Sequence, residues 1–514
     1  MDNSNKVSHI IYSIIVIAYC ILIGLILLDI TILGSSDYLY KKDFALNNIV
    51  ILIIVVLVIG LGYLLYRYGK IKISKYVIWI ASFVLLCAQL FVYYNILFVT
   101  HTWDAGTILE DAIHVTQGMY VFSDMEYYSH FPNNVWLFSI ISVIIRLCNL
   151  VGITGFESQL YTIVVIQSIL STLTGVLVYK AVKDATRSRA YGIVSWVLYV
   201  VLIGLSAQGV IVYSDMMSLI FPVLVFRLYQ TTQDGDKIYV KWFLIVLLSI
   251  VGFKIKPTAV IVLIGIIVVE IIDRIINHKT QKIIGILKIV ASVAAAAILG
   301  VILSYGVTKS SGITIDKELN TGPLHMLMMG TNDNTNGSFN MTDVMLSEKV
   351  RTKDERTKLQ LETIKERVSN RGFGGNVSFY INKALMIFND GTFAIGDEGG
   401  YYDEVFPDKM GKVSSALKSW YYSDGELFGV SSMIQHIVWI AIILLNVLAC
   451  IGIRDKDKYK ATLAISLAGI IVFNLLFEAR ARYLLIYVPL FVIMAICSLD
   501  NIYTLVKEKQ TNKL

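Results

Sequence analysis

The sequence predicts an all-α polytopic membrane protein with about twelve transmembrane helices. Of its 514 residues, 56% are hydrophobic and only 16% are charged, whereas soluble domains carry about 25% charged residues. The stretches Ile10 to Leu33, Ile49 to Tyr66 and Tyr76 to Val99 are predominantly apolar, and about 20 such residues cross a bilayer as a helix. We therefore place the chain in the cell membrane, in contact with lipid.

The distribution of basic residues predicts the orientation. The formal net charge is +6, but Lys and Arg gather in short segments between apolar runs, and such segments favour the cytoplasm. Residues 67–75, 180–189, 237–241, 274–288 and 454–460 are assigned to that side, which also places both termini in the cytoplasm. This pattern excludes nucleic acid as a partner. All five cysteines lie in apolar runs without a CxxC pair, which argues against a disulfide framework.

The hydropathy pattern divides the chain into five parts. Residues 1–99 form three N-terminal spans, and residues 100–158 form an external loop rich in acidic residues and interfacial helices. Residues 159–307 form a transmembrane core, and residues 308–432 are polar and long enough for a small external domain. Residues 433–514 supply the C-terminal spans and a cytoplasmic tail. A polar helix is predicted within the external domain, over Thr342 to Val368.

One apolar run breaks the alternation of sides. Val135 to Val151 is long enough to cross the membrane, but crossing would place the basic segment 180–189 outside. We therefore expect this run to lie in the outer interface or to be re-entrant, with Arg146 toward headgroups or protein. A spanning helix is the alternative.

The first external loop opens with Trp103-Asp104, directly after a span. A helix there places Asp104 and Asp111 on one face and His114 on the adjoining face. A carboxylate at a membrane surface can act as general base for an acceptor hydroxyl, so Asp104 is the candidate catalytic residue. Asp111 and His114 are candidates for positioning an acceptor or a metal ion. The simpler interpretation is that these side chains only solvate an external loop.

Four further charges stand at the predicted outer ends of spans. Asp215 lies among apolar residues, where an ionisable group is costly and therefore a functional candidate. Lys256, before Pro257, stands on the outside against the usual charge bias. Arg480 and Arg482 join two spans, and guanidinium groups bind phosphate with two parallel hydrogen bonds. The positions predict an anion-binding site, although either Arg could instead reach lipid headgroups or pair with Glu478.

Other side chains are candidates for binding sugar, because aromatic rings stack on the apolar faces of sugars and carboxylates accept their hydroxyl protons. These candidates are Trp103, His130, Asp390 and Tyr401. The loops that hold Asp390 and Tyr401 interleave acidic and aromatic residues, which is also the composition of an ordinary turn-rich loop.

Together these motifs resemble the GT-C superfamily of multi-span glycosyltransferases, which includes protein O-mannosyltransferases, aminoarabinose transferases and oligosaccharyltransferases. Trp103-Asp104 resembles the acidic motif of that superfamily's first external loop, and Tyr213-Ser214-Asp215 resembles its second acid. Arg480-Ala481-Arg482-Tyr483 is similar to its late Arg-Tyr motif. The segments 128–134 and 254–258 are similar to uncharacterised Firmicutes members. Asp104 is followed by Ala105 rather than by the second acid of the protein O-mannosyltransferases.

The resemblance implies transfer of a sugar from a polyprenyl-phosphate donor to an extracytoplasmic acceptor, by inverting displacement. The acceptor class is a cell-wall polysaccharide, teichoic acid or glycolipid. Arg480, Arg482 and Lys256 would hold the donor phosphate, Asp104 would act as base, and Asp215 would orient the acceptor or a metal ion. A divalent cation, Mg²⁺ or Mn²⁺, shared by Asp104 and Asp215 is left open. The alternatives are a polysaccharide polymerase or ligase, and a flippase for lipid-linked sugars.

Overall fold

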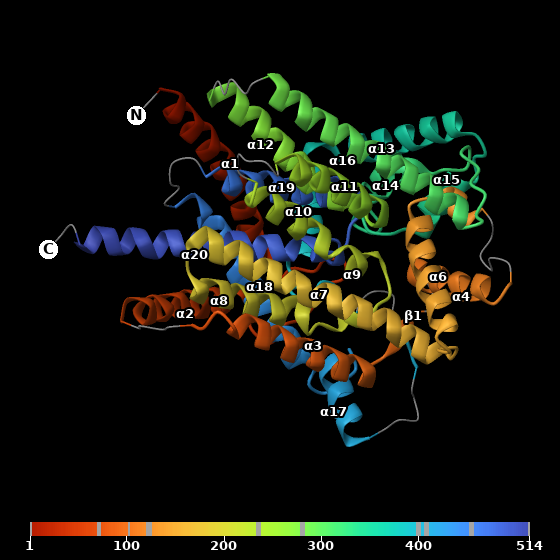
Figure 1. Cartoon of the computed structure of the whole chain (residues 1–514), viewed down its shortest axis with the longest axis horizontal. Helices are drawn as coiled ribbons and strands as arrows, with labels where there is room; N and C mark the ends of the chain where they lie inside the picture. Colours follow the sequence, from red (N-terminus) through yellow and green to blue (C-terminus); the bar gives the residue numbers. More distant parts are fainter. Residues whose placement is uncertain are drawn as a thin grey trace.

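The chain is an all-α polytopic membrane protein in the computed structural model. The structure describes residues 3–68, 73–100, 103–119, 126–232, 238–277, 283–396, 402–405, 411–451 and 457–511. Both ends of the chain lie at the same end of the helix bundle (Figure 1). The opposite end of the bundle is called the distal end below.

The elements of the first half are α1 (Asn3–Leu33), α2 (Asn48–Tyr68), α3 (Val77–Asn95), β1 (Phe98–Thr100), α4 (Asp104–Thr116), α5 (Tyr127–His130), α6 (Asn134–Leu150), α7 (Phe156–Thr186), α8 (Arg189–Tyr199), η1 (Val200–Gly204), η2 (Ala207–Val210), α9 (Ser214–Ser218), α10 (Ile220–Gln230) and α11 (Ile238–Ile255). Those of the second half are η3 (Pro257–Val260), α12 (Ile261–Asn277), α13 (Ile283–Ser310), α14 (Gly322–Met329), α15 (Met341–Glu348), α16 (Lys353–Phe388), β2 (Tyr402–Glu404), α17 (Lys412–Tyr421), α18 (Phe428–Val447), η4 (Leu448–Cys450), α19 (Lys458–Leu476), η5 (Ala481–Tyr487) and α20 (Val488–Thr511).

Among the described residues, eight helices are long and apolar enough to cross a membrane, fewer than the predicted count of about twelve. They are α1, α3, α7, α11, α13, α18, α19 and α20. The other predicted spans correspond to α2, which has 21 residues, to α8 with η1, to α10 and to α12. Helices α8 and α10 have 11 residues each, and α12 has 17. The break between α9 and α10 lies just before Pro222, which has no N–H to donate to the carbonyl of Ser218 four residues earlier.

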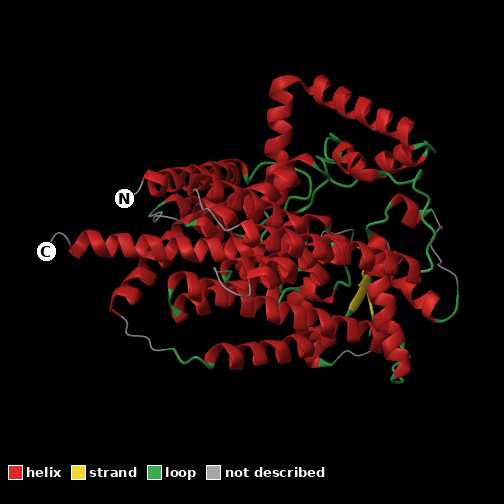
Figure 2. Ribbon diagram, turned by 45° about the horizontal axis from the view of Figure 1, so that its top comes forward, coloured by secondary structure: helices red, strands yellow, loops and turns green. Residues whose placement is uncertain are grey.

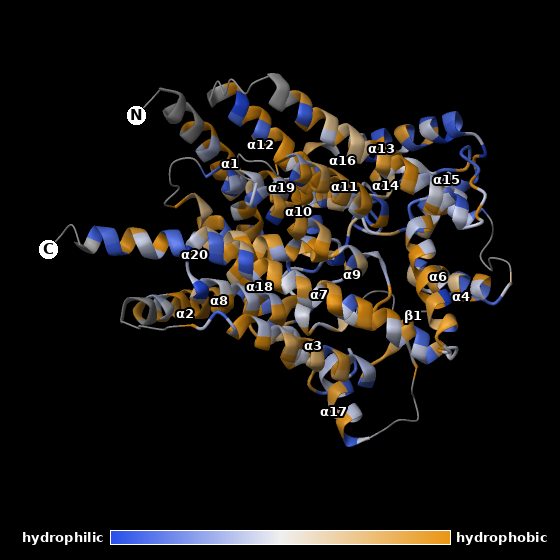
Figure 3. Cartoon of the chain, viewed as in Figure 1, coloured by the Kyte–Doolittle hydropathy of each residue, from blue (hydrophilic) through white to orange (hydrophobic). Residues whose placement is uncertain are grey.

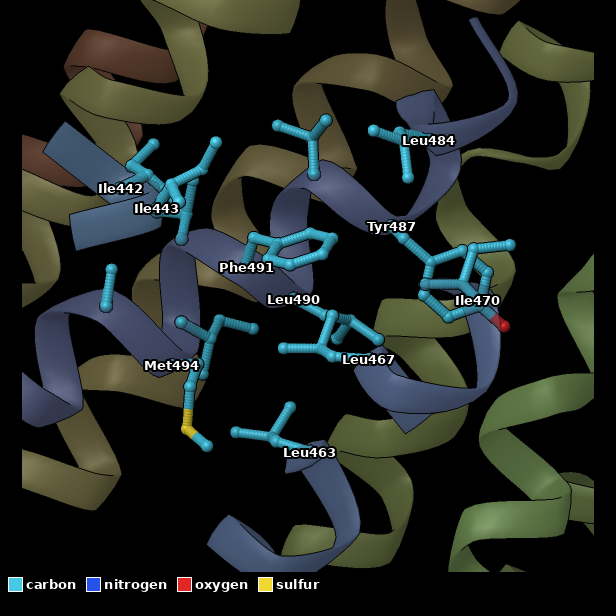
Figure 4. Close-up of a cluster of buried hydrophobic side chains, with 14 of the residues drawn as sticks. Ile442, Ile443, Leu463, Leu467, Ile470, Leu484, Tyr487, Leu490, Phe491 and Met494 are labelled. Carbon is cyan, nitrogen blue, oxygen red and sulfur yellow. The ribbon is translucent and has the colours of Figure 1, made fainter. Parts of the chain in front are cut away.

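Helix α20 lies at the centre of the bundle. In the most apolar 18-residue stretch within Ala481–Lys509, 78% is buried, compared with 11% for the corresponding stretch of Leu287–Ser310 in α13. Helix α20 is therefore largely surrounded by protein, whereas α13 presents side chains such as Val301 outward. Phe491 and Met494 of α20 pack close to Ile443 of α18 and Leu463 of α19 (Figure 4). A helix that is apolar on all sides belongs either in a core or in lipid, and only the packing distinguishes the two.

Helix α6 covers the predicted interfacial run Val135 to Val151. It packs against α4, α7, α11 and α13, and it runs across the direction of α3 and α7 at the distal end (Figure 1). Arg146 is exposed, while Leu137 and Ile141 on the same helix are fully buried. One face of α6 is therefore packed against protein, and its place in the membrane interface stays a prediction.

Polar residues dominate a second region at the distal end, which contains α14, α15 and α16 and is called the α14–α16 unit (residues 311–388) (Figure 3). The predicted single helix over Thr342 to Val368 is wrong, because the chain forms two helices that are separated near Arg351. Helix α16 is bent at Gly372, where φ is 61°. Figure 2 shows its two arms at the top of the view, meeting at this bend.

Arginines of α16 hold this unit together through carbonyl and carboxylate oxygens. The guanidinium of Arg356 is fully buried and donates to the carbonyls of Glu318, Ser347 and Val350. Arg367 donates to both carboxylate oxygens of Asp343, at 2.6 and 3.0 Å, and to the carbonyl of Met328. The unit is therefore fixed largely by charge-assisted hydrogen bonds, which are stronger than neutral ones.

Replacing Arg367 with Met should destabilise the α14–α16 unit by about 3–5 kcal/mol, because the buried Asp343 loses its cation. The control is Arg351→Met, which removes an exposed pair with Glu126 and should cost less than about 1 kcal/mol. Limited proteolysis of the detergent-solubilised protein during a thermal ramp measures both effects. Equal losses in the two variants would contradict a structural role for the buried pair.

Candidate functional site

Three charged side chains form a buried cluster at the distal end. Lys256 Nζ lies 2.6 Å from Asp215 Oδ1, and Arg482 Nη1 lies 2.9 Å from Asp215 Oδ2. All three residues are at least 90% buried. They come from α9, from the junction of α11 with η3, and from η5. The sequence placed each of them at the outer end of a span, and the structure brings them into one contact.

Local sequence explains why each charge points into this cluster. Proline disfavours the helical conformation of the residue before it, so Lys256, before Pro257, is extended and α11 ends at Ile255. Asp215 lies in the first turn of α9, where the helix dipole favours a negative charge. Arg480 is extended at φ −140°, which turns the chain from α19 into η5 and aims Arg482 inward.

The cluster sets the ionisation of its members. Burial alone would raise the pKa of Asp215, but the charges of Lys256 and Arg482 and their hydrogen bonds together lower it below its usual value. Burial lowers the pKa of Lys256, and Asp215 opposes that effect. With Asp215 ionised and both cations charged, the three groups carry one net positive charge.

Asp104 lies beside this cluster, at the first turn of α4. Its carboxylate accepts hydrogen bonds from the hydroxyls of Tyr127, at 2.8 Å, and Tyr213, at 2.9 Å. Asn134 donates in turn to the hydroxyl of Tyr127. Burial and the Asp104 charge raise the pKa of both phenols, so both remain protonated donors. Asp104 itself is half-buried.

Aromatic rings connect Asp104 to the cation cluster. The guanidinium of Arg482 lies 4.5 Å from the ring centroid of Trp103 and 5.2 Å from that of Tyr213. The two rings meet edge to face, with centroids 5.2 Å apart. Tyr213 therefore touches both Asp104 and Arg482, and cation–π contacts of this kind strengthen when the groups are desolvated. Trp103, Asp104, Asp215, Lys256 and Arg482 form the candidate site.

The other predicted residues lie around or apart from this site. Asp111 is buried on α4 and accepts a hydrogen bond from Tyr128 at 2.9 Å, while His114 is half-buried on the same helix. Arg480 does not join the cluster and stacks on the ring of Tyr40 at 3.5 Å. His130 is buried, and its carbonyl accepts two hydrogen bonds from Thr321.

Asp390 belongs to a different environment. Its carboxylate accepts hydrogen bonds from the backbone of Thr392 and Ala394 and lies 3.4 Å from Lys42. It stabilises a turn in which Phe393 and Ala394 adopt positive φ angles, which non-glycine residues rarely do. The contacts assign Asp390 a structural task. The predicted sugar-binding Tyr401 lies outside the described residues.

The residues present do not fit a divalent cation shared by Asp104 and Asp215. Both oxygens of Asp215 already contact cationic side chains, and those of Asp104 accept phenol hydrogen bonds. Within the described part of the chain, no three His, Cys, Asp or Glu side chains are grouped so that they could hold a metal ion.

Sequence reasoning missed the supporting residues Tyr127 and Tyr213. Both stand in segments that the sequence analysis selected for other side chains. The role of Tyr213 depends on its hydrogen bond to Asp104, which is 109 residues away in the sequence. The signal that could have identified these two tyrosines was a phenol hydroxyl close in sequence to a predicted acidic site residue.

Comparison with known proteins gives one match. A family model described as "conserved hypothetical integral membrane protein" matches residues 1–503. No curated protein and no solved structure matches the chain.

Replacing Asp215 with Asn should destabilise the protein by about 3–5 kcal/mol, because two buried cations lose the carboxylate that they share. Thermal unfolding in detergent at neutral pH measures this loss, and Asp104→Asn, at a half-buried position without cationic partners, should cost less. The Asp215 contribution is present above the ordinary carboxyl pKa and is lost as the pH falls through its lowered folded value. The Asn variant should therefore lose less stability on acidification than the wild type does.

Proposed function

The chain belongs to this family of integral membrane proteins, and from that premise we propose that it is a glycosyltransferase. It moves a sugar from a polyprenyl-phosphate donor in the membrane to an acceptor at the extracytoplasmic side, such as a cell-wall polysaccharide, teichoic acid or glycolipid. The distal end of the bundle faces outward in this proposal, and both termini face the cytoplasm, as the basic segments of the sequence favour.

One observation carries the proposal. Trp103, Asp104, Asp215, Lys256 and Arg482 stand in four separate segments of the chain, and they meet at one end of the bundle. The arrangement places a half-buried carboxylate beside two buried cations, which suits transfer from a phosphate-linked donor. The separation of base and cations by aromatic rings also suits a sugar, which stacks on such rings.

The cations would act on the leaving group. As the bond between the anomeric carbon and the donor phosphate breaks, its electron pair passes to the phosphate oxygen. Lys256 and Arg482 stabilise this developing charge, and because their positions are fixed beforehand they need little reorganisation. Asp215 touches both cations, so in this mechanism it positions them. This task replaces the expected role in orienting an acceptor or a metal ion.

Asp104 would act on the acceptor. The acceptor hydroxyl oxygen attacks the anomeric carbon from the side opposite the phosphate, and its proton passes to the Asp104 carboxylate. The product has inverted configuration, and the polyprenyl phosphate is released. The hydroxyls of Tyr127 and Tyr213 hold the carboxylate in one orientation, which is the preorganisation that such proton transfer needs.

The Asp104→Asn variant should reduce sugar transfer by at least about 100-fold, since a positioned general base contributes about that much or more. The assay measures radiolabelled sugar passed from a panel of polyprenyl-phosphate donors to endogenous acceptor in membranes, at matched expression. Glu110→Gln, an exposed acid on the same helix, is the control and should retain activity. Unchanged transfer by Asp104→Asn would reject Asp104 as the base and favour a polymerase that uses another loop.

The Arg482→Lys variant keeps the positive charge but loses the planar group that contacts Asp215 and Trp103 together. We expect transfer to fall on the order of 100-fold, comparable with the loss of one charge-stabilising donor. Arg480→Lys is the matched comparison, because Arg480 stacks on Tyr40 outside the cluster and should lose much less. Equal effects in the two variants would remove the distinction between the two arginines.

A further inference from the structure

A buried amine on α16 lies close to the segment that carries Arg482. Lys383 is fully buried, and its Nζ donates to the carbonyl of Gly330 at 2.8 Å and to that of Phe477 at 2.6 Å. Gly330 precedes a loop of the α14–α16 unit, and Phe477 is the first residue after α19. The side chain therefore bridges two backbones that are far apart in sequence.

The backbones joined by Lys383 also pair directly. The N–H of Glu478 donates to the carbonyl of Met326 at 2.7 Å, and that of Ala479 donates to the carbonyl of Gly337 at 3.1 Å. A Cβ at Gly330 would collide with the carbonyl of Leu476, so only glycine permits this close approach. Residues 477–479 are thus each held to the α14–α16 unit, directly before Arg480.

This segment leads straight into the candidate site. It continues through Arg480 into η5, where Arg482 contacts Asp215. The carboxylate of Glu478 accepts a hydrogen bond from Tyr483 at 2.6 Å, which ties the segment to η5 once more. A shift of residues 477–480 would therefore move Arg482 relative to Asp215.

The same unit reaches the other half of the site. The N–H of Asp316 donates to the hydroxyl of Ser129, and Thr321 donates to the carbonyl of His130. Both acceptors lie in α5, which also contains Tyr127, a partner of Asp104. Residues 316–337 consequently contact α5, whose Tyr127 donates to the proposed base Asp104. They also contact Glu478 and Ala479, which lead to the proposed phosphate ligand Arg482.

We propose that Lys383 is a positioning residue for Arg482: by bridging the carbonyls of Gly330 and Phe477, it fixes residues 477–480 on the α14–α16 unit and so sets where the guanidinium stands. This inference rests on the proposed function for the identity of the phosphate ligand. The bridge itself is a property of the fold and can be tested without any sugar donor.

The environment of Lys383 supports a positioning role over simple packing. Burial lowers the pKa of Lys383 to about 7, with Glu478 opposing that effect and Arg371 adding to it. Burying an amine in this way is costly, whereas an apolar side chain of similar length would fill the same space. The two hydrogen bonds to carbonyls are what an apolar replacement would lose.

The test compares Lys383→Met with Arg356→Met, since both side chains are buried cations of α16 that donate to carbonyls. The described partners of Arg356 are the carbonyls of Glu318, Asn320, Ser347 and Val350, all of which lie outside residues 476–482. In the transfer assay, Lys383→Met should raise KM for the donor by about tenfold and also lower kcat, because Arg482 both holds the donor phosphate and stabilises the charge that develops on it. Arg356→Met should lower the fraction of active protein, which reduces the apparent kcat at an unchanged KM.

A second readout does not depend on catalysis. Ala479 is fully buried, so Ala479→Cys should react slowly with a hydrophilic maleimide, in a Cys87→Ser background because Cys87 is exposed. Adding Lys383→Met should speed labelling about tenfold or more, whereas adding Arg356→Met should not.

The outcomes separate the two ideas. A higher donor KM together with faster labelling supports the inference, and wild-type KM or wild-type labelling in Lys383→Met overturns it. If wild-type protein transfers no sugar from any donor, the proposed function fails, and labelling alone then decides whether Lys383 holds residues 477–480. In that case, faster labelling of Lys383→Met would support the bridge by Lys383, while the proposal that Arg482 binds a donor phosphate would be rejected.

Discussion

The carboxylate of Asp215 is the interaction on which the distal end of the bundle depends. Removing an ion from water costs several kcal/mol even in real proteins, and here two cations are buried together with a single anion. The three charges belong to α9, the α11–η3 junction and η5, so satisfying them fixes three chain segments at once. The same contact places two cationic side chains beside Trp103 and Tyr213, next to Asp104.

A related principle organises the α14–α16 unit. Its structure depends less on an apolar core than on the cations of α16, which donate to backbone carbonyls and to Asp343. Such bonds are directional, so each one specifies where a loop must lie. A region stabilised in this way can have a polar surface and still contact the transmembrane helices at defined residues, here 477–479 after α19. The two kinds of organisation meet at residues 477–480, between Lys383 and Arg482.

The sequence indicated much of this arrangement because charges at the ends of apolar runs are conspicuous. Asp104, Asp215, Lys256 and Arg482 were candidates for that reason alone, and the structure groups them. Lys383 gave no such signal, since it follows a polar stretch and only the folded chain buries it. Helices α8 and α10, at two of the other predicted spans, are short because the π-helical turn η1 and Pro222 interrupt apolar runs that appear continuous by hydropathy. Asp390 stabilises a turn with positive φ angles, as an acid among aromatic residues can, and its sugar binding stays a prediction.

The central place of α20 has a consequence for how the protein is made. Helix α20 follows all the other described helices in the sequence, yet helices synthesised earlier surround most of it. Domains generally fold from the N-terminus during synthesis, whereas this bundle has no centre until the ribosome has delivered α20. The earlier helices must wait in the bilayer with the space for α20 unfilled. Since Arg482 arrives directly before α20, the core and the cluster of Asp215, Lys256 and Arg482 are completed together, and a chain that lacks α20 and η5 contains neither.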